Sequence, residues 1–161
     1  MDSLARRGPG HGEYVAFRVA GQSFCVDIMT VREIRGWSAE TRVPQAPAYM
    51  RGVTNLRGAI LPIIDAATRL DLPSAGPSAR SVTIVLQHGD RLAGLLVDEV
   101  SDIVTVAPED IQPTPDLACT AEDGFVCGLI SMNGDLMSKV SVERLLFGGP
   151  GPTDLAAPVA A

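Results

Sequence analysis

The chain has 161 residues and a formal net charge of −6, with 46% hydrophobic, 20% charged and 4% aromatic residues. This composition predicts a globular protein whose core is built mainly from Val, Ile and Leu. An acidic chain has no electrostatic reason to bind nucleic acid. The sequence shows no signal peptide and no run of about 18 apolar residues that could span a membrane, so we expect a cytoplasmic protein.

Alternation of apolar and polar residues, interrupted by 16 Gly and 12 Pro, predicts an all-β chain with many turns. The predicted strands are 14–20, 23–28, 32–37, 53–57, 59–64, 82–87, 91–97, 100–106, 127–132 and 134–142. Short helical turns are expected at 47–51, 65–70 and 142–147. The Gly- and Pro-rich ends, residues 1–12 and 148–161, are expected to be flexible tails, and residues 73–80 a loop.

The two sides of the 73–80 loop resemble each other. Three sets of positions match in the same order: YVAFRVAG (14–21) with VTIVLQHG (82–89), IMTVREI (28–34) with VDEVSDI (97–103), and Gly52 and Gly58 with Gly128 and Gly134. The shifts are 68, 69 and 76 residues, which indicates small insertions. We therefore predict a duplication of two similar five-stranded units, about 13–72 and 81–147, each closed into a small barrel that removes exposed strand edges.

The sequence marks no catalytic, metal or cofactor site. It has two histidines, no P-loop, no HExxH motif and no zinc-ligand spacing. Among the three cysteines there is no CxxC pair, and Cys25 is expected to be a buried apolar residue. Asp98 and Glu99 are adjacent in a predicted strand, so their carboxylates point to opposite faces and do not favour a paired-carboxylate hydrolase. We expect a binding protein, with an enzyme or small-molecule carrier as the alternative.

Charged residues embedded in apolar, strand-like segments mark a candidate binding surface. Arg57 lies in GVTNLRGAILPIID and Glu33 in TVREI. An arginine among apolar neighbours is typical of an interface hot spot, although an exposed strand face or an internal ion pair would show the same pattern. The candidate residues are Val31, Glu33, Ile34, Gly52, Asn55, Arg57, Val82 and Thr83.

Over residues 13–147 the chain resembles the CheW family, the coupling proteins of bacterial chemotaxis. The likeness lies in the segments YVAFRVAGQSFCVDIMTVREIRG, VPQAPAYMRGVTNLRGAILPIID and LAGLLVDEVSDIVTV. It implies a single CheW-like domain of two five-stranded SH3-like β-barrels side by side, with short helical turns and a C-terminal helix. It also implies a non-enzymatic adaptor that couples the cytoplasmic tips of methyl-accepting chemoreceptors to the regulatory domain of a CheA-type histidine kinase in receptor arrays.

The same resemblance assigns a receptor-binding groove between the barrels. That groove would be lined by Val31, Glu33, Ile34, Gly52, Asn55, Leu56 and Arg57, with Val82 and Thr83 nearby. The family has no short signature for kinase contacts, so none are predicted. Further CheW copies are candidate partners, and a module serving pilus motility, cell polarity or another chemosensory kinase is the alternative function. The last predicted strand departs from the family pattern at Ser138 and Lys139.

Overall fold

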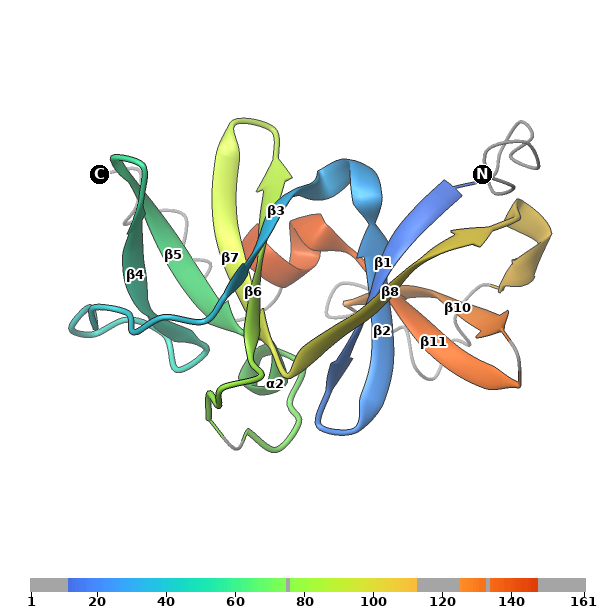
Figure 1. Cartoon of the computed structure of the whole chain (residues 1–161), viewed down its shortest axis with the longest axis horizontal. Coiled ribbons are helices and arrows are strands. Elements are labelled where there is room, and N and C mark those ends of the chain that lie inside the picture. The colour runs from blue at the N-terminus through green and yellow to red at the C-terminus, as the bar shows by residue number, and fades with distance from the viewer. Residues whose placement is uncertain (1–11, 75, 113–124, 133, 148–161) are drawn as a thin grey trace.

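The computed structural model describes residues 12–74, 76–112, 125–132 and 134–147. In these residues the chain forms eleven strands in two sheets, which lie side by side in Figure 1. The first sheet, barrel I, has the order β8-β1-β2-β11-β10-β9. Its strands are β1 (Gly12–Val19), β2 (Gln22–Asp27), β8 (Glu99–Val106), β9 (Ile111–Gln112), β10 (Val126–Met132) and β11 (Asp135–Val140).

The second sheet, barrel II, has the order β3-β6-β7-β5-β4. Its strands are β3 (Val31–Gly36), β4 (Met50–Leu56), β5 (Ala59–Asp65), β6 (Val82–His88) and β7 (Arg91–Val97). The short helices are η1 (Ile28–Thr30), α2 (Ala66–Arg69), η2 (Pro108–Asp110) and the π-helix η4 (Glu143–Phe147). The mostly β architecture predicted from the sequence is confirmed, although neither sheet is closed by a continuous ladder.

The structure confirms all ten predicted strands to within three residues at each end. The helical turns expected at 65–70 and 142–147 are α2 and η4, whereas 47–51 is a turn that leads into β4. Strand β9 was not predicted, because two residues are too few to show an alternation. Except for Gly12, which begins β1, the two expected tails lie outside the described residues. The atypical Ser138 and Lys139 lie within β11, where they pair with β2.

The strand order corrects the expected boundary between the two units. Each half of the chain contributes strands to both barrels, because β3 pairs with β6 while β8 pairs with β1. Barrel II is therefore the contiguous segment 31–97, and barrel I combines the strands before it with those after it. A repeat in sequence shows which strands correspond but not which strands pair. The strands of the predicted halves 13–72 and 81–147 are thus distributed over both barrels.

The strand ladders also correct the register of the repeat. Ala16 pairs with Asp102 in β8, and Val85 pairs with Glu33 in β3. Since Asp102 corresponds to Glu33 at a shift of 69, Ala16 corresponds to Val85 at the same shift. The predicted shift of 68 for the first strand is wrong by one residue, because it aligned two turn glycines that occupy different positions in their turns. A slip of one residue in a strand exchanges the faces of every side chain.

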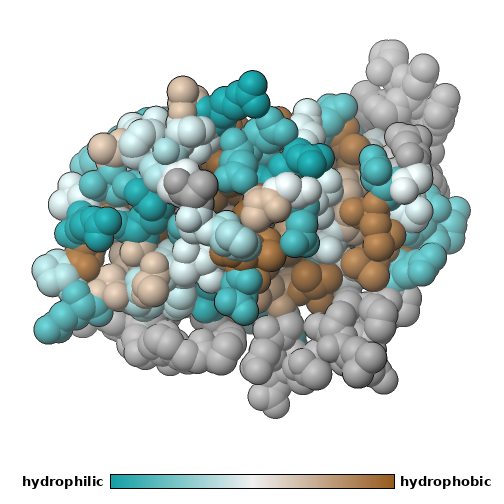
Figure 2. All heavy atoms as spheres, turned by 90° about the horizontal axis from the view of Figure 1, so that it is seen from below, coloured by the Kyte–Doolittle hydropathy of each residue, from teal (hydrophilic) through white to brown (hydrophobic). Residues whose placement is uncertain are grey.

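Three clusters of buried side chains hold the molecule together. The largest, the shared core, joins both barrels through β1, β2, β5, β6, β7, α2 and η4 and includes Phe17, Ile84 and Leu145. Smaller clusters fill barrel I around Ile130 and barrel II around Leu61. On the face seen in Figure 2, hydrophobic residues also gather near the middle and over barrel I. Because the shared core contains side chains from both barrels, neither barrel is a separate domain.

Arg69 of α2 connects barrel II to η4. Its Nε donates to the Leu145 carbonyl oxygen at 2.8 Å, and its Nη2 donates to the Arg144 carbonyl oxygen at 3.1 Å. The guanidinium carbon lies 4.2 Å from the centre of the Tyr49 ring and 4.7 Å from that of Phe125. Burial lowers the pKa of the Arg69 guanidinium below its ordinary value. These contacts hold η4, which follows the last strand of barrel I, against barrel II.

Candidate partner-binding site

A salt bridge between Glu33 and Arg57 joins the two edges of barrel II. Arg57 Nη2 donates to Glu33 Oε1, and Arg35 Nε lies 3.7 Å from Glu33 Oε2. Glu33 comes from edge strand β3, whereas Arg57 follows β4 at the opposite edge of the sheet. The Glu33 side chain is 27% exposed and the Arg57 side chain 71% exposed. The salt bridge therefore presents a largely solvent-facing guanidinium.

Arg57 reaches β3 because it lies in a turn rather than in the strand. The β4–β5 hairpin has a two-residue turn, in which Arg57 has φ 51° and Gly58 has φ 92°. Positive φ at both positions is typical of the type I′ turns that connect hairpins. The Asn55 side-chain oxygen accepts a hydrogen bond from the Gly58 amide at 2.9 Å and holds this turn. The prediction of a strand over 53–57 was one residue too long.

Gly52 permits a close contact that helps to complete barrel II. The extended chain after β3 forms an isolated bridge with β4, in which Thr41 and Val53 exchange two backbone hydrogen bonds of 2.8 Å. Gly52 has φ 153°, and a Cβ added there would lie 2.3 Å from the Thr41 carbonyl oxygen. No residue with a side chain fits at this distance. Gly52 thus acts on the predicted surface indirectly, by allowing the β3–β4 connection to approach β4.

The apolar part of the candidate surface lies along β3 and the start of β6. Val31 and Val82 are half-buried against the shared core, while Ile34 is 44% exposed. Ile34 pairs with Ile84 of the shared core, so it extends the same apolar face outward. Met29, in the preceding η1, is 85% exposed. Sequence reasoning missed Met29, although a methionine beside a predicted binding strand could have indicated it.

Two of the predicted site residues are interior residues. Leu56 is 7% exposed and belongs to the barrel II core. Thr83 is 6% exposed, and its methyl group lies so close to Gly94 that a Cβ at that glycine would be 2.7 Å away. Because side chains alternate along a strand, Val82 and Thr83 face opposite sides of β6. The side chains of Leu56 and Thr83 therefore support the surface from inside and do not form part of it.

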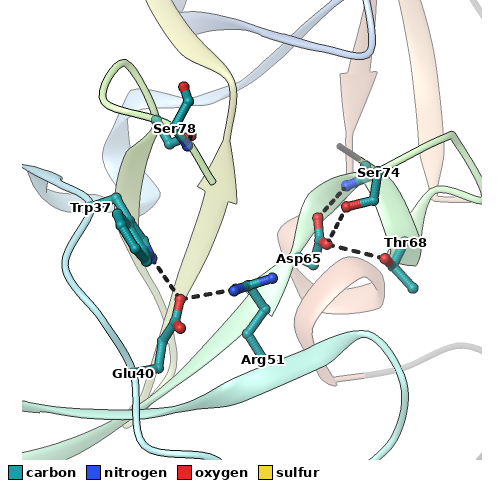
Figure 3. Close-up of polar contacts among 9 residues, drawn as sticks. Trp37, Glu40, Arg51, Asp65, Thr68, Ser74 and Ser78 are labelled. Atoms are coloured by element: carbon teal, nitrogen blue, oxygen red, sulfur yellow. Dashed lines mark hydrogen bonds and ion pairs between the residues drawn. The ribbon is translucent and has the colours of Figure 1, made fainter. Parts of the chain in front are cut away.

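A polar cluster that was not predicted fixes the connection between β3 and β4 (Figure 3). Glu40 accepts hydrogen bonds from Trp37 Nε1 at 2.8 Å and from Arg51 Nε at 3.0 Å. Desolvation raises the pKa of the Glu40 carboxyl, but these hydrogen bonds outweigh it, and the pKa lies below its ordinary value. Glu40 immediately precedes Thr41 of the barrel-closing bridge. Arg51 lies eleven residues after Glu40 in the sequence and on another strand, so only the folded structure reveals the cluster.

The other chemical groups of interest are candidate metal ligands and the thiol of Cys25. In residues 12–74, 76–112, 125–132 and 134–147 no group of three or more His, Cys, Asp or Glu could hold a metal ion. Burial raises the pKa of the Cys25 thiol to about 12, which keeps it protonated. No helix in this part of the chain is long and apolar enough to cross a membrane.

Two small barrels that share a core, and that expose apolar side chains beside a charged pair on one edge, define a protein-interaction module. The chain matches the family model of the CheW-like domain over residues 13–147. It is 52% identical to the chemotaxis protein CheW of Rhizobium meliloti (strain 1021) over 136 residues, which cover 84% of this chain and 88% of that protein. It is 36% identical to the chemotaxis protein CheW of Klebsiella aerogenes over 134 residues, covering 83% and 81%.

The fold is also similar to a solved structure. The crystal structure of the scaffolding protein TtCheW from Thermoanaerobacter tengcongensis matches with a TM-score of 0.78 and 28% sequence identity, covering 84% of this chain and 92% of that chain. The chain belongs to the CheW-like family. Its role is that of a scaffold in chemotaxis signalling, and a module for another pathway is not favoured.

Proposed function

We propose that the chain couples the cytoplasmic tip of methyl-accepting chemoreceptors to the regulatory domain of a CheA-type histidine kinase, and that it has no enzymatic activity of its own. The observation that carries this proposal is the exposed Glu33–Arg57 salt bridge beside the apolar edge of β3. Through these partners the protein would be cytoplasmic and held in receptor arrays, together with further CheW copies.

The surface suits a helical partner. An amphipathic helix binds by laying apolar side chains at helical spacing against an apolar groove. Ile34 and Met29 are exposed, and Val31 and Val82 are half-buried against the shared core. Arg57 carries five N–H donors, of which the salt bridge to Glu33 engages one. The Arg57 side chain is 71% exposed, so its other N–H groups can donate hydrogen bonds to backbone or carboxylate oxygens of a docked helix.

The test compares three variants for binding to two baits, a chemoreceptor cytoplasmic fragment and the kinase regulatory domain, by titration calorimetry. Arg57→Glu places two carboxylates at the edge of barrel II, and truncating a hot-spot arginine typically costs about 2 kcal/mol. We expect receptor binding to weaken by about 30-fold or more, with kinase binding and thermal unfolding nearly unchanged. Arg42→Glu, an equal charge change at an exposed loop position of barrel II, is the matched control.

The charge-swapped double variant Glu33→Arg/Arg57→Glu separates two roles of the arginine. If the salt bridge only shapes the surface, the swap restores receptor binding. If Arg57 contacts the receptor directly, receptor binding stays weak although the swap allows the salt bridge to form again. Unchanged receptor binding in Arg57→Glu, or equal losses in Arg57→Glu and Arg42→Glu, would contradict the proposed surface. Binding of neither bait by the native chain would contradict the proposed partners.

A further inference from the structure

The two barrels differ at the end where Glu33 and Arg57 meet. In barrel II the salt bridge joins β3 to the β4–β5 turn, and Leu61 and the half-buried Leu92 belong to the core cluster of this barrel or pack against it. The ladders and the hairpins give the equivalent positions in barrel I at shifts of 69 and 76 residues. There Asp102 takes the place of Glu33, Met137 that of Leu61, Ser23 that of Leu92 and Asp135 that of Ala59. At the position of barrel I that corresponds to Arg57, the sequence has Asn133, which lies outside the described residues.

The equivalent end of barrel I is hollow. A space of about 260 Å³ lies between β8, β1, β2 and β11, and its walls include Ser23, Asp102, Asp135 and Met137. Met137 belongs to the barrel I core, so the hollow has an apolar floor. Ser23 is smaller than Leu92, the residue at the matching position of barrel II, and so leaves more space above Met137. The two aspartates also line the hollow. At the matching positions of barrel II, Leu61 is buried in the core cluster and Leu92 packs against it.

The charges around the hollow favour a cation. Arg18 also lines it, but its Nη2 donates to the Gly21 carbonyl oxygen at 3.1 Å and its Nε lies 3.8 Å from Glu99 Oε2. Asp102 Oδ1 accepts a hydrogen bond from the Ile103 backbone amide at 2.7 Å, and Oδ2 can still accept one from a ligand. Within the described part of the chain, the Asp135 carboxylate has no hydrogen-bond or ion-pair partner.

The segments that supply the two barrels also have opposite charge. Among the described residues, those at 12–27, 98–112, 125–132 and 134–147 contain three Lys or Arg and nine Asp or Glu, whereas those at 28–74 and 76–97 contain eight and five. Barrel I is therefore the acidic part of the molecule and barrel II the basic part. A surface with an excess of one sign raises the local concentration and the association rate of oppositely charged partners.

We propose that the open end of barrel I is a socket for an arginine side chain of a protein partner. The partner's arginine would occupy, from outside, the space that Arg57 covers within barrel II. A planar guanidinium suits this socket because it forms paired hydrogen bonds to carboxylates and packs its faces against apolar groups. The carboxylates of Asp102 and Asp135 would accept its N–H groups, while Met137 would contact its face. This proposal does not rest on the receptor or kinase assignment.

The test is a titration of the isotope-labelled full chain with N-acetyl-arginine amide, followed by NMR. We expect saturable shifts of the Ser23 and Asp102 amides with a dissociation constant in about the millimolar range, as for a ligand of this size. N-acetyl-citrulline amide, which has nearly the same shape but no charge, should produce no saturable shift. N-acetyl-lysine amide should bind several-fold more weakly, because an ammonium cannot form the paired hydrogen bonds.

The variant Asp102→Asn/Asp135→Asn should weaken binding of the arginine probe at least tenfold. Both positions are exposed, so thermal unfolding is expected to change little, and it is measured alongside. The matched control Asp90→Asn/Asp110→Asn removes the same charge from other exposed sites. Equal losses in both double variants would reduce the effect to net charge and overturn the socket. Equal binding of the lysine or citrulline probe would overturn the guanidinium assignment, and so would the absence of saturable shifts.

Discussion

Gly52→Ala tests how barrel II is completed. The new methyl group would lie 2.3 Å from the Thr41 carbonyl oxygen and 2.8 Å from its carbonyl carbon, so the backbone of this bridge has to move. Separation breaks the two hydrogen bonds between Thr41 and Val53, each worth about 1 kcal/mol. The positive φ of 153° adds about 1 kcal/mol of backbone strain for a residue other than glycine. We expect the free energy of unfolding to fall by roughly 3 kcal/mol.

Gly58→Ala is the matched control for this prediction. Gly58 also has a positive φ, 92°, but nothing lies within 4 Å of an added Cβ. Its substitution should therefore cost only the backbone term of about 1 kcal/mol. Urea unfolding of both variants, monitored by the fluorescence of the single tryptophan, measures the difference. If Gly52→Ala is no less stable than Gly58→Ala, the bridge at Thr41 does not contribute to barrel II as argued.

Two further substitutions test the contacts that hold the site in place. Arg69→Met keeps an apolar stem against Tyr49 but leaves the Leu145 carbonyl without its buried donor, so we expect a loss of about 3 kcal/mol in a urea titration, and a loss below 1 kcal/mol would contradict the role of this contact. Glu40→Gln removes a carboxylate. Desolvation raises its pKa in the folded state, but the hydrogen bonds from Trp37 and Arg51 lower the pKa by more, so the net shift is downward. Its stabilising effect is present above the ordinary pKa of 4.5 and is lost as the pH falls through the lower folded-state value, so the stability difference between the native chain and Glu40→Gln should shrink in acid. A difference that stays constant from pH 7 to about pH 3 would contradict this reasoning.

The positions of the strands along the chain could be predicted because each strand shows a local alternation of apolar residues and ends at turn residues. The repeat was also visible, since the glycines of the hairpins and the motif TVREI recur in VSDI of the second half. The exchange of strands between barrels could not be predicted, because pairing between distant strands leaves no mark in a local pattern. The same limit explains the one-residue error in the register of the first strand.

The candidate site was predictable in part. Glu33 and Arg57 stood out as charged residues in apolar segments, and the structure brings them together. Leu56 and Thr83 were included because they are neighbours of surface residues in sequence, although the alternation of a strand turns their side chains inward. The salt bridge itself depends on the curvature of barrel II, which brings its two edge strands close, and curvature cannot be read from composition.

The exchange of strands has a mechanical consequence. Within the described residues, the strands of one barrel lead directly into those of the other at two places, through the three residues of η1 and through the single residue Asp98. Had each half formed its own barrel, residues 73–80 would have served as a hinge between two swivelling bodies. Instead that loop joins α2 to β6 within barrel II, and both crossings border the shared core, which includes Val97 and contacts Ile28. We therefore expect a displacement of one barrel to move the other with it, because side chains of both barrels pack in the shared core.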